Sequence, residues 1–118
     1  PVRWIVDDAL SFLRREVRRG RRYDAIILDP PAFGRGPSGT HWKLSRDLAP
    51  LLDTAQKLLT ERPLFFLLSW HDPALPAEEI LKMTPARLRN GAVETVSLVI
   101  PCETGGALSG GTALRFRF

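Results

Sequence analysis

Cysteine is almost absent from this sequence: Cys102 is the one thiol in a chain of 118 residues. A single cysteine excludes an internal disulfide and favours a reducing compartment. Apolar runs of membrane-spanning length and a signal-peptide pattern are also lacking. We therefore expect a cytoplasmic protein without membrane contact. The first residue is Pro1 rather than methionine, which we interpret as a sign of truncation.

Acidic residues are fewer than basic ones. Lys and Arg together number 17 against 13 for Asp and Glu, which gives a formal net charge of +4. This excess weakly favours acidic partners, nucleic acid among them. Hydrophobic residues make up 44% of the chain, enough to pack the core of one modest domain. The residue pattern predicts no metal site.

The hydrophobic pattern predicts strands and helices in alternation. We expect strands at 2–6, 24–29, 64–69, 92–100 and 112–118. Gly105-Gly106 and Gly110-Gly111 predict a flexible turn before the last strand. Helices are expected from Asp7 or Asp8 to Gly20, over 43–60 and over 76–89, with Pro50 and Pro85 kinking or breaking the last two. Strands separated by helices pair in parallel, and the last strand suits antiparallel pairing. The predicted fold is therefore α/β with a doubly wound, mostly parallel sheet.

The segment "YDAIILDPPAFGRG" at 23–36 joins a buried strand to an unusual loop. Pro30 and Pro31 cannot donate backbone hydrogen bonds, so the strand must end at Asp29. This rigid end holds a carboxylate at the carboxyl end of the strand. Ligands of open α/β sheets bind at that edge.

The element order, together with "LDPPAFGRG" after the second strand, resembles the C-terminal half of a class I S-adenosylmethionine-dependent methyltransferase. The bacterial ribosomal-RNA large-subunit methyltransferases with an Asp-Pro-Pro-x-Phe motif are the most similar group. The resemblance implies a Rossmann-like fold with an antiparallel last strand. It covers nearly the whole chain but only about half of such a domain. Residues 1–118 are therefore interpreted as the C-terminal part of a single catalytic domain.

The resemblance implies a role for each residue of the motif. Asp8 would accept a hydrogen bond from the adenine amine of S-adenosylmethionine, or it would simply cap the first helix. Asp29 would border the methyl-transfer site, near the methionine end of the cofactor or the target. Pro30 and Pro31 would fix the loop and point backbone carbonyls at the substrate. Phe33 would stack on a flipped base, unless it packs in the core while Asp29 caps its own turn.

Two groups of basic residues are candidates for RNA contacts. Arg35 and Lys43 lie near the motif and could hold phosphates, or they could belong to a solvated loop. The run "RREVRRGRR" at 14–22 ends the first helix. A crossover helix runs antiparallel to its strands, so this end should lie on the edge opposite the motif. We expect a solvated helix end there, or a contact with a remote part of a large RNA.

The sequence departs from the family in several places. The N-terminal strands, the glycine-rich loop and the ribose-binding acid are missing, so we expect this chain alone to bind cofactor weakly and to be inactive. "GRGPSG" at 34–39 follows two prolines, so it does not predict the cofactor loop. Ser69 to Asp72 stand where cytosine carbon-5 methyltransferases carry a cysteine nucleophile. His71 there is a general base, a turn residue, or a stacking group alongside Trp70. Ala32 replaces a common Lys.

The resemblance favours methyl transfer to RNA, above all ribosomal RNA, with S-adenosylmethionine as donor. The alternatives are methylation of DNA or protein, or a non-catalytic α/β binding or assembly domain. In the resembled fold, missing strands lie between those at 2–6 and 24–29. Unpaired hydrophobic edges promote association. A truncated chain or a homo-oligomer is therefore expected.

Overall fold

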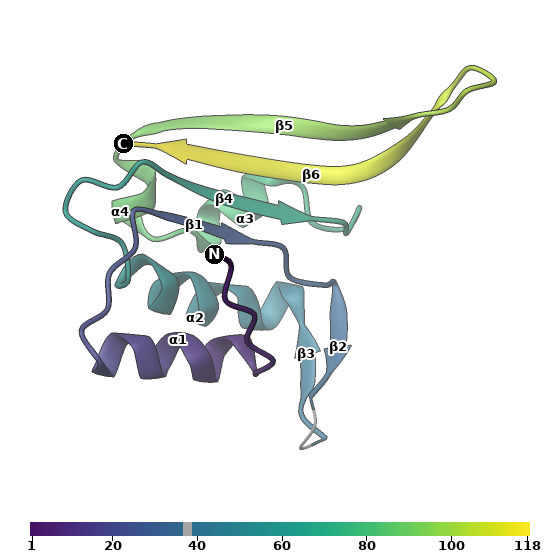
Figure 1. The fold of residues 1–118 in the computed structure, drawn as a ribbon. Helices are drawn as coiled ribbons and strands as arrows, with labels where there is room; N and C mark the ends of the chain where they lie inside the picture. The colour runs from purple at the N-terminus through teal and green to yellow at the C-terminus, as the bar shows by residue number, and fades with distance from the viewer. Residues whose placement is uncertain (37–38) are drawn as a thin grey trace.

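The computed structural model describes residues 1–36 and 39–118. Its elements, in chain order, are α1 (Ala9–Arg18), β1 (Ala25–Leu28), β2 (Phe33–Arg35), β3 (His41–Lys43), α2 (Leu44–Gln56), β4 (Phe65–Trp70), α3 (Ala77–Met83), α4 (Ala86–Arg89), β5 (Ala92–Pro101) and β6 (Ala107–Arg117). Strands alternate with helices through the first part of the chain, and a long hairpin of strands ends it (Figure 1).

The main sheet has the strand order β1-β4-β6-β5 within the part of the chain that the structure describes. β1 and β4 pair in parallel, whereas β6 pairs antiparallel with both of its neighbours. Consequently β1, β4 and β5 run in one direction and β6 runs against them. The prediction of an α/β fold, mostly parallel with an antiparallel last strand, is confirmed.

The hydrophobic core lies between the sheet and the helices. Along β4, Phe66, Leu68 and Trp70 are buried and belong to the same cluster as buried residues of all the labelled helices. Burying a side chain of this size contributes roughly 1.5–3 kcal/mol. The intervening side chains of β4 point to the other face and are half-buried. The prediction that this strand is fully buried was therefore wrong, because these helices cover one face of the sheet.

The segment at 2–6, expected to be a strand, has no regular structure. Trp4 is 88% exposed and Val6 is fully exposed. A strand needs a neighbour for its backbone hydrogen bonds, and none of the described strands pairs with this segment. The helix that follows begins and ends as predicted: Asp8 caps α1, and Gly20 lies beyond it with φ of +67°.

The two helix prolines have different effects. Pro50 lies inside α2 without splitting it, because five buried side chains anchor that helix to the core, namely Leu44, Leu48, Leu51, Leu52 and Ala55. Pro85 separates α3 from α4, as predicted. Thr84 before it has extended backbone angles, the conformation that a following proline favours.

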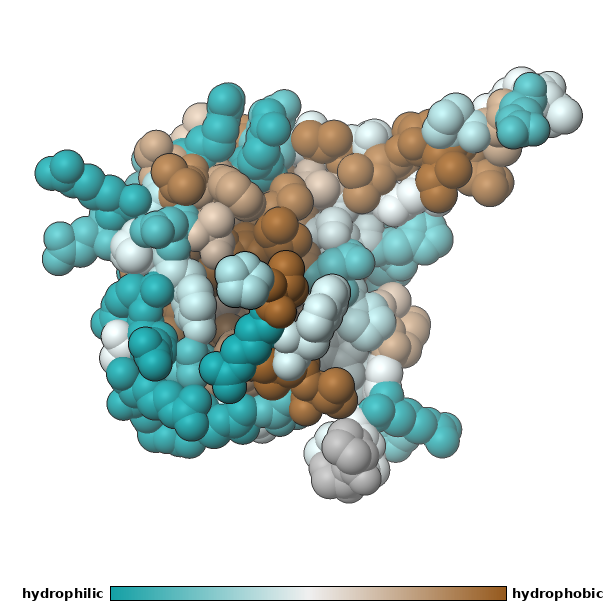
Figure 2. Space-filling model, in the orientation of Figure 1, coloured by the Kyte–Doolittle hydropathy of each residue, from teal (hydrophilic) through white to brown (hydrophobic). Residues whose placement is uncertain are grey.

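β5 and β6 form a hairpin arm that extends past the rest of the sheet (Figure 1). The predicted turn at Gly105 and Gly106 is present, and both have positive φ. The turn expected at Gly110 and Gly111 was wrong, since both lie inside β6 beside a shift of register. The strand is longer than expected because a bulge there accommodates the glycines. Exposed apolar side chains line the arm (Figure 2).

Among the described helices, none combines the length and the apolar character that crossing a membrane requires.

Gly111 and Gly105 make a matched pair for testing the packing of β6. Both have positive φ, but a Cβ on Gly111 would lie 2.3 Å from the Trp70 carbonyl oxygen, whereas nothing lies within 4 Å at Gly105. We expect Gly111→Ala to cost about 3 kcal/mol of stability and Gly105→Ala about 1 kcal/mol, the strain of the backbone alone. Urea unfolding measures both, and equal losses would contradict the close approach of β6 to β4.

Candidate functional site

The acid of the motif lies at the carboxyl edge of the sheet. β1 ends at Leu28, and the exposed side chain of Asp29 follows it. Asp29 Oδ1 accepts a hydrogen bond of 2.6 Å from the hydroxyl of Ser69 on β4. Since β1 and β4 run in parallel, both side chains stand where their strands end. The carboxylate is therefore held in place but remains open to solvent.

The chain after the prolines forms a β-hairpin where the sequence predicted a pliable loop. β2 and β3 pair antiparallel, with Phe33 opposite Lys43 and Arg35 opposite His41. Directly opposed residues share a face of the hairpin, so these four side chains lie on one side. The strands are too short for alternation to be seen in the sequence. Pro37 and Ser38 of "GRGPSG" lie outside the described residues.

Two hydrogen bonds join this hairpin to the proline corner. Trp42 Nε1 donates to the Pro31 carbonyl at 2.7 Å, and the Leu44 amide donates to the Ala32 carbonyl at 2.9 Å. These carbonyls help to hold the hairpin, and the expectation that carbonyls of the loop point at the substrate stays a prediction. The prolines limit the backbone, and Trp42 then sets the direction in which the hairpin leaves it.

The second strand of the hairpin, β3, is fixed to α2. Asp47 accepts a hydrogen bond of 2.8 Å from the backbone N–H of Lys43, the residue that precedes the helix. Arg46 donates to Asp47 and to the carbonyl of His41. The Arg46 hydrogen bond, followed by that from Lys43, lowers the pKa of Asp47. The carboxylate therefore stays ionised at neutral pH and ties β3 to the first turn of α2.

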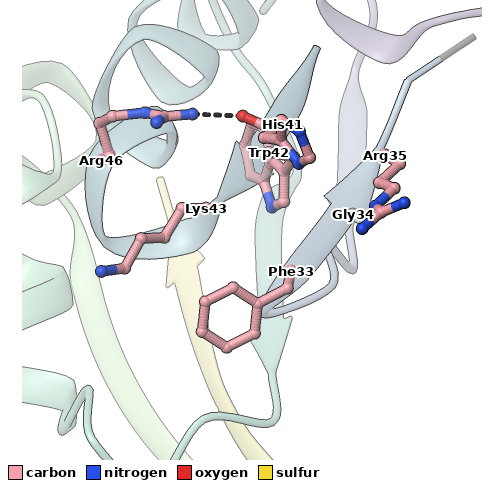
Figure 3. A pocket seen from close by; sticks show the side chains of 7 residues that line it. All are labelled: Phe33, Gly34, Arg35, His41, Trp42, Lys43 and Arg46. Atoms are coloured by element: carbon pink, nitrogen blue, oxygen red, sulfur yellow. Dashed lines mark hydrogen bonds between the residues drawn. The ribbon is translucent and has the colours of Figure 1, made fainter. Parts of the chain in front are cut away.

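The side chains around the hairpin border a shallow, open hollow of about 430 Å³, lined by Phe33, Gly34, Arg35, His41, Trp42, Lys43 and Arg46 (Figure 3). The Phe33 ring is 69% exposed and stands clear of the strands. The alternative that Phe33 packs in the core was therefore wrong. Phe33, Arg35 and Lys43, singled out in the sequence, come together here. His41 and Trp42 were missed, because only the strand pairing brings them to the hollow. Arg46 was missed too, and it reaches the hollow from the first turn of α2.

Asp8 lies at the start of α1, on the side of the molecule where β1 ends (Figure 1). Its Oδ1 accepts a hydrogen bond of 2.8 Å from the Ser11 amide, so it caps the helix. No other hydrogen bond to its carboxylate occurs within the described residues, which leaves Oδ2 available to a further donor. The cap and a ligand contact are therefore compatible.

The basic end of α1 lies on the far side of the molecule from the hairpin (Figure 1). Arg15 pairs with Asp7, and Arg19 pairs with Glu16 at 3.1 Å. Glu16 also accepts a hydrogen bond from the Tyr23 hydroxyl, which lowers the pKa of the carboxyl and raises that of the phenol. Part of this basic run is thus engaged in fixing α1.

Near the end of β4, Trp70 and His71 differ in exposure. Trp70 is buried, and its Nε1 donates to the Leu75 carbonyl at 2.8 Å. Its ring therefore belongs to the core and cannot stack on a ligand beside His71. His71 itself is exposed.

The Trp42 hydrogen bond can be tested by Trp42→Phe, which keeps an aromatic ring but removes the donor. We expect faster amide hydrogen exchange across 31–36 and 39–44, and a stability loss of about 1 kcal/mol. Trp4→Phe is the matched control, since that ring is 88% exposed. Unchanged exchange at the Leu44 amide in Trp42→Phe would contradict the coupling of hairpin and corner.

Comparison with known proteins gives matches among solved structures. A search of protein-family models and a search of curated proteins each found no match. The SAM-dependent methyltransferase from Agrobacterium tumefaciens is 33% identical, with a TM-score of 0.86 over 99% of this chain. SMU.776, assigned as a methyltransferase and determined in complex with SAH, is 17% identical, with a TM-score of 0.71 over 96% of this chain. A protein from Streptococcus mutans, assigned as a SAM-dependent methyltransferase, is 16% identical, with a TM-score of 0.67 over 96% of this chain.

The chain spans 40% of the length of the Agrobacterium protein and 30% of the other two. The two matches below 25% identity show the fold alone, and the Agrobacterium match adds sequence similarity along the whole chain. The resemblance to methyltransferases seen in the sequence is therefore confirmed: this chain has the fold of one part of the class I S-adenosylmethionine-dependent methyltransferases. The ribosomal-RNA type stays a prediction.

Proposed function

We propose that the intact protein transfers a methyl group from S-adenosylmethionine to RNA, and that ribosomal RNA is its substrate. The observation that carries this proposal is the corner at the end of β1. There Ser69 holds the exposed carboxylate of Asp29. Two prolines connect this residue to a hairpin that presents the exposed ring of Phe33. The solved structures with this fold include methyltransferases, one of them in complex with SAH.

The cofactor would be held only in part by residues of this chain. Asp8 stands at the start of α1 with one carboxylate oxygen available, and an adenine amine is a suitable donor to it. The glycine-rich loop and the ribose-binding acid expected of this fold are not in the sequence. Cofactor binding is therefore proposed for the intact protein.

S-adenosylmethionine supplies an electrophilic methyl group, so the main task of the protein residues is to place the target atom in line with it. Asp29 would accept a hydrogen bond from an N–H of the target and so orient it. Phe33 would stack on the target base. Pro30 and Pro31 would keep the distance between these two side chains constant.

A nucleic acid is favoured over protein because of what surrounds the corner, and RNA over DNA because of the resemblance carried by the Asp-Pro-Pro-x-Phe segment. Arg35 and Lys43 carry positive charge on the same face as the Phe33 ring, which suits a phosphate on either side of a stacked base. Ribosomal RNA is reached in the cytoplasm, where we place the protein. Equal methylation of duplex DNA or of protein would overturn this choice of substrate.

The proposed role of Asp8 can be separated from its capping role by two substitutions. Serine caps a helix as well as aspartate does, so Asp8→Ser should leave the melting temperature unchanged while removing the carboxylate. We expect its affinity for S-adenosylmethionine to fall about tenfold or more, as for a lost hydrogen bond to a charged group. Asp8→Ala should lose both affinity and about 1 kcal/mol of stability.

Isothermal titration calorimetry on the intact protein measures this binding. Unchanged affinity in Asp8→Ser would show that the residue is only a cap. If the wild-type protein binds no S-adenosylmethionine at high micromolar concentration, the methyltransferase proposal fails, and the non-catalytic binding or assembly domain becomes the better interpretation.

Asp29→Asn tests the chemical step. It keeps the shape of the side chain but weakens its ability to accept a proton or orient an N–H. We expect kcat for methyl transfer to ribosomal RNA to fall about 10²-fold or more, with cofactor affinity retained. Ser69→Ala should lose less, because it only frees the Asp29 carboxylate. Asp53→Asn on α2, whose carboxylate forms an exposed ion pair with Lys57, is the control. Full activity of Asp29→Asn would refute the role.

A further inference from the structure

One face of the β2–β3 hairpin gathers side chains that suit unpaired nucleotides. Its pairs are Phe33 with Lys43 and Arg35 with His41, so an aromatic ring, two permanent cations and an imidazole share that face. All four side chains are exposed, and all of them line the hollow in Figure 3. We call this set, Phe33, Arg35, His41 and Lys43, the hairpin face.

The cations of the hairpin face are available to a ligand. Within residues 1–36 and 39–118, neither Arg35 nor Lys43 side chain takes part in an ion pair or a hydrogen bond. Arg46 also lines the hollow, but its charge is compensated by Asp47 at 2.7 Å. Two uncompensated positive charges therefore lie beside an exposed ring.

The hairpin face is held in a defined position relative to Asp29. Trp42 joins the hairpin to the Pro31 carbonyl, and Asp47 joins it to α2. Because both strands of the hairpin are anchored at its base, this end of the face needs little ordering when a ligand binds, and this raises affinity. A nucleotide on the Phe33 ring would also be fixed relative to the carboxylate.

We propose that the hairpin face binds a single-stranded segment of RNA, with phosphates on Arg35 and Lys43 and a base stacked on Phe33. His41 would add a contact at the far end of the face. This inference rests on the proposed function and narrows its substrate to unpaired nucleotides, those of a loop, bulge or strand end. A duplex keeps its bases stacked inside, so it offers the ring no partner.

The far end of α1 provides a matched control surface. Arg18 and Arg21 are exposed there, and neither forms an ion pair within the described residues. They carry the same charge as the hairpin cations but lie on the opposite side of the molecule (Figure 1). Neutralising either pair changes the net charge equally, so a difference between the two variants reports position rather than total charge.

The experiment is a titration of a labelled, unstructured RNA with the intact protein, without cofactor, followed by fluorescence anisotropy. An RNA of about 12 nucleotides is long enough to span one binding face. Each variant is measured at several salt concentrations. In Arg35→Gln/Lys43→Gln, we expect the slope of log K against log salt to decrease by about 1.4, from roughly 0.7 per lost phosphate contact. Arg18→Gln/Arg21→Gln should keep the wild-type slope.

Phe33→Leu separates stacking from charge. We expect affinity to fall about tenfold, with the salt slope unchanged, since only the base contact is lost. Arg35→Lys/Lys43→Arg should keep the wild-type slope, which shows that charge at these positions is what matters. A melting temperature equal to that of the wild-type protein shows that each variant is folded.

Three outcomes would overturn the inference: an unchanged slope in the hairpin variant, a slope lowered only in the α1 variant, or tighter binding of duplex than of single-stranded RNA. These outcomes are independent of the methyltransferase proposal. If calorimetry shows S-adenosylmethionine binding while the hairpin variant binds RNA normally, only the hairpin inference fails. If the hairpin variant loses RNA binding while no cofactor binds, the proposed activity fails and the RNA site stands.

Discussion

The end of strand β1 is the constraint on which the candidate site depends. Two successive prolines cannot continue the ladder, so the strand stops at Leu28 and the next side chain, Asp29, is left at the edge of the sheet. Ser69 on the neighbouring strand then holds its carboxylate. The two strands are parallel and Leu28 pairs with Leu68, so Asp29 and Ser69 follow at the same level, and a single hydrogen bond is enough to fix the acid without burying it.

The hairpin depends on the same corner. The prolines limit the backbone angles of the corner. The Trp42 indole then fixes the hairpin against it by donating a hydrogen bond to the Pro31 carbonyl. A second anchor comes from Asp47, whose lowered pKa keeps it charged and bonded to the start of α2. A short two-stranded hairpin is marginal by itself in water. These anchors explain how three-residue strands keep a defined face toward solvent.

Buried and charged residues occupy different parts of the molecule. The core joins the helices to one face of the sheet, and the site stands at the carboxyl edge of that sheet. The basic end of α1 lies on the opposite side, where Arg19 and Glu16 are paired and Tyr23 joins them. Cations near a helix C-terminus also favour the helix dipole. Basic residues therefore occur both at the end of α1 and on the hairpin, and their positions in the fold distinguish the two groups.

Local physics in the sequence was sufficient for the framework. Hydrophobic periodicity found α1, α2 and strand β4, and the inability of proline to donate located the corner at Asp29 and the break at Pro85. These features depend on residues within a turn or two of one another. The family resemblance carried by the Asp-Pro-Pro-x-Phe segment added the Rossmann-like fold and its antiparallel last strand. All of this could be stated before any contact was known.

Tertiary structure decided the rest, because each remaining feature needs a partner distant in sequence. The segment at 2–6 has the composition of a strand but no neighbour to pair with, so it is not one. The hairpin face exists only because Phe33 meets Lys43 across ten residues, and its direction depends on a tryptophan reaching back to Pro31. The sequence alone determined where the strand must stop and which acid follows it. Which side chains surround that acid was decided by pairing and hydrogen bonds that form only in the folded chain.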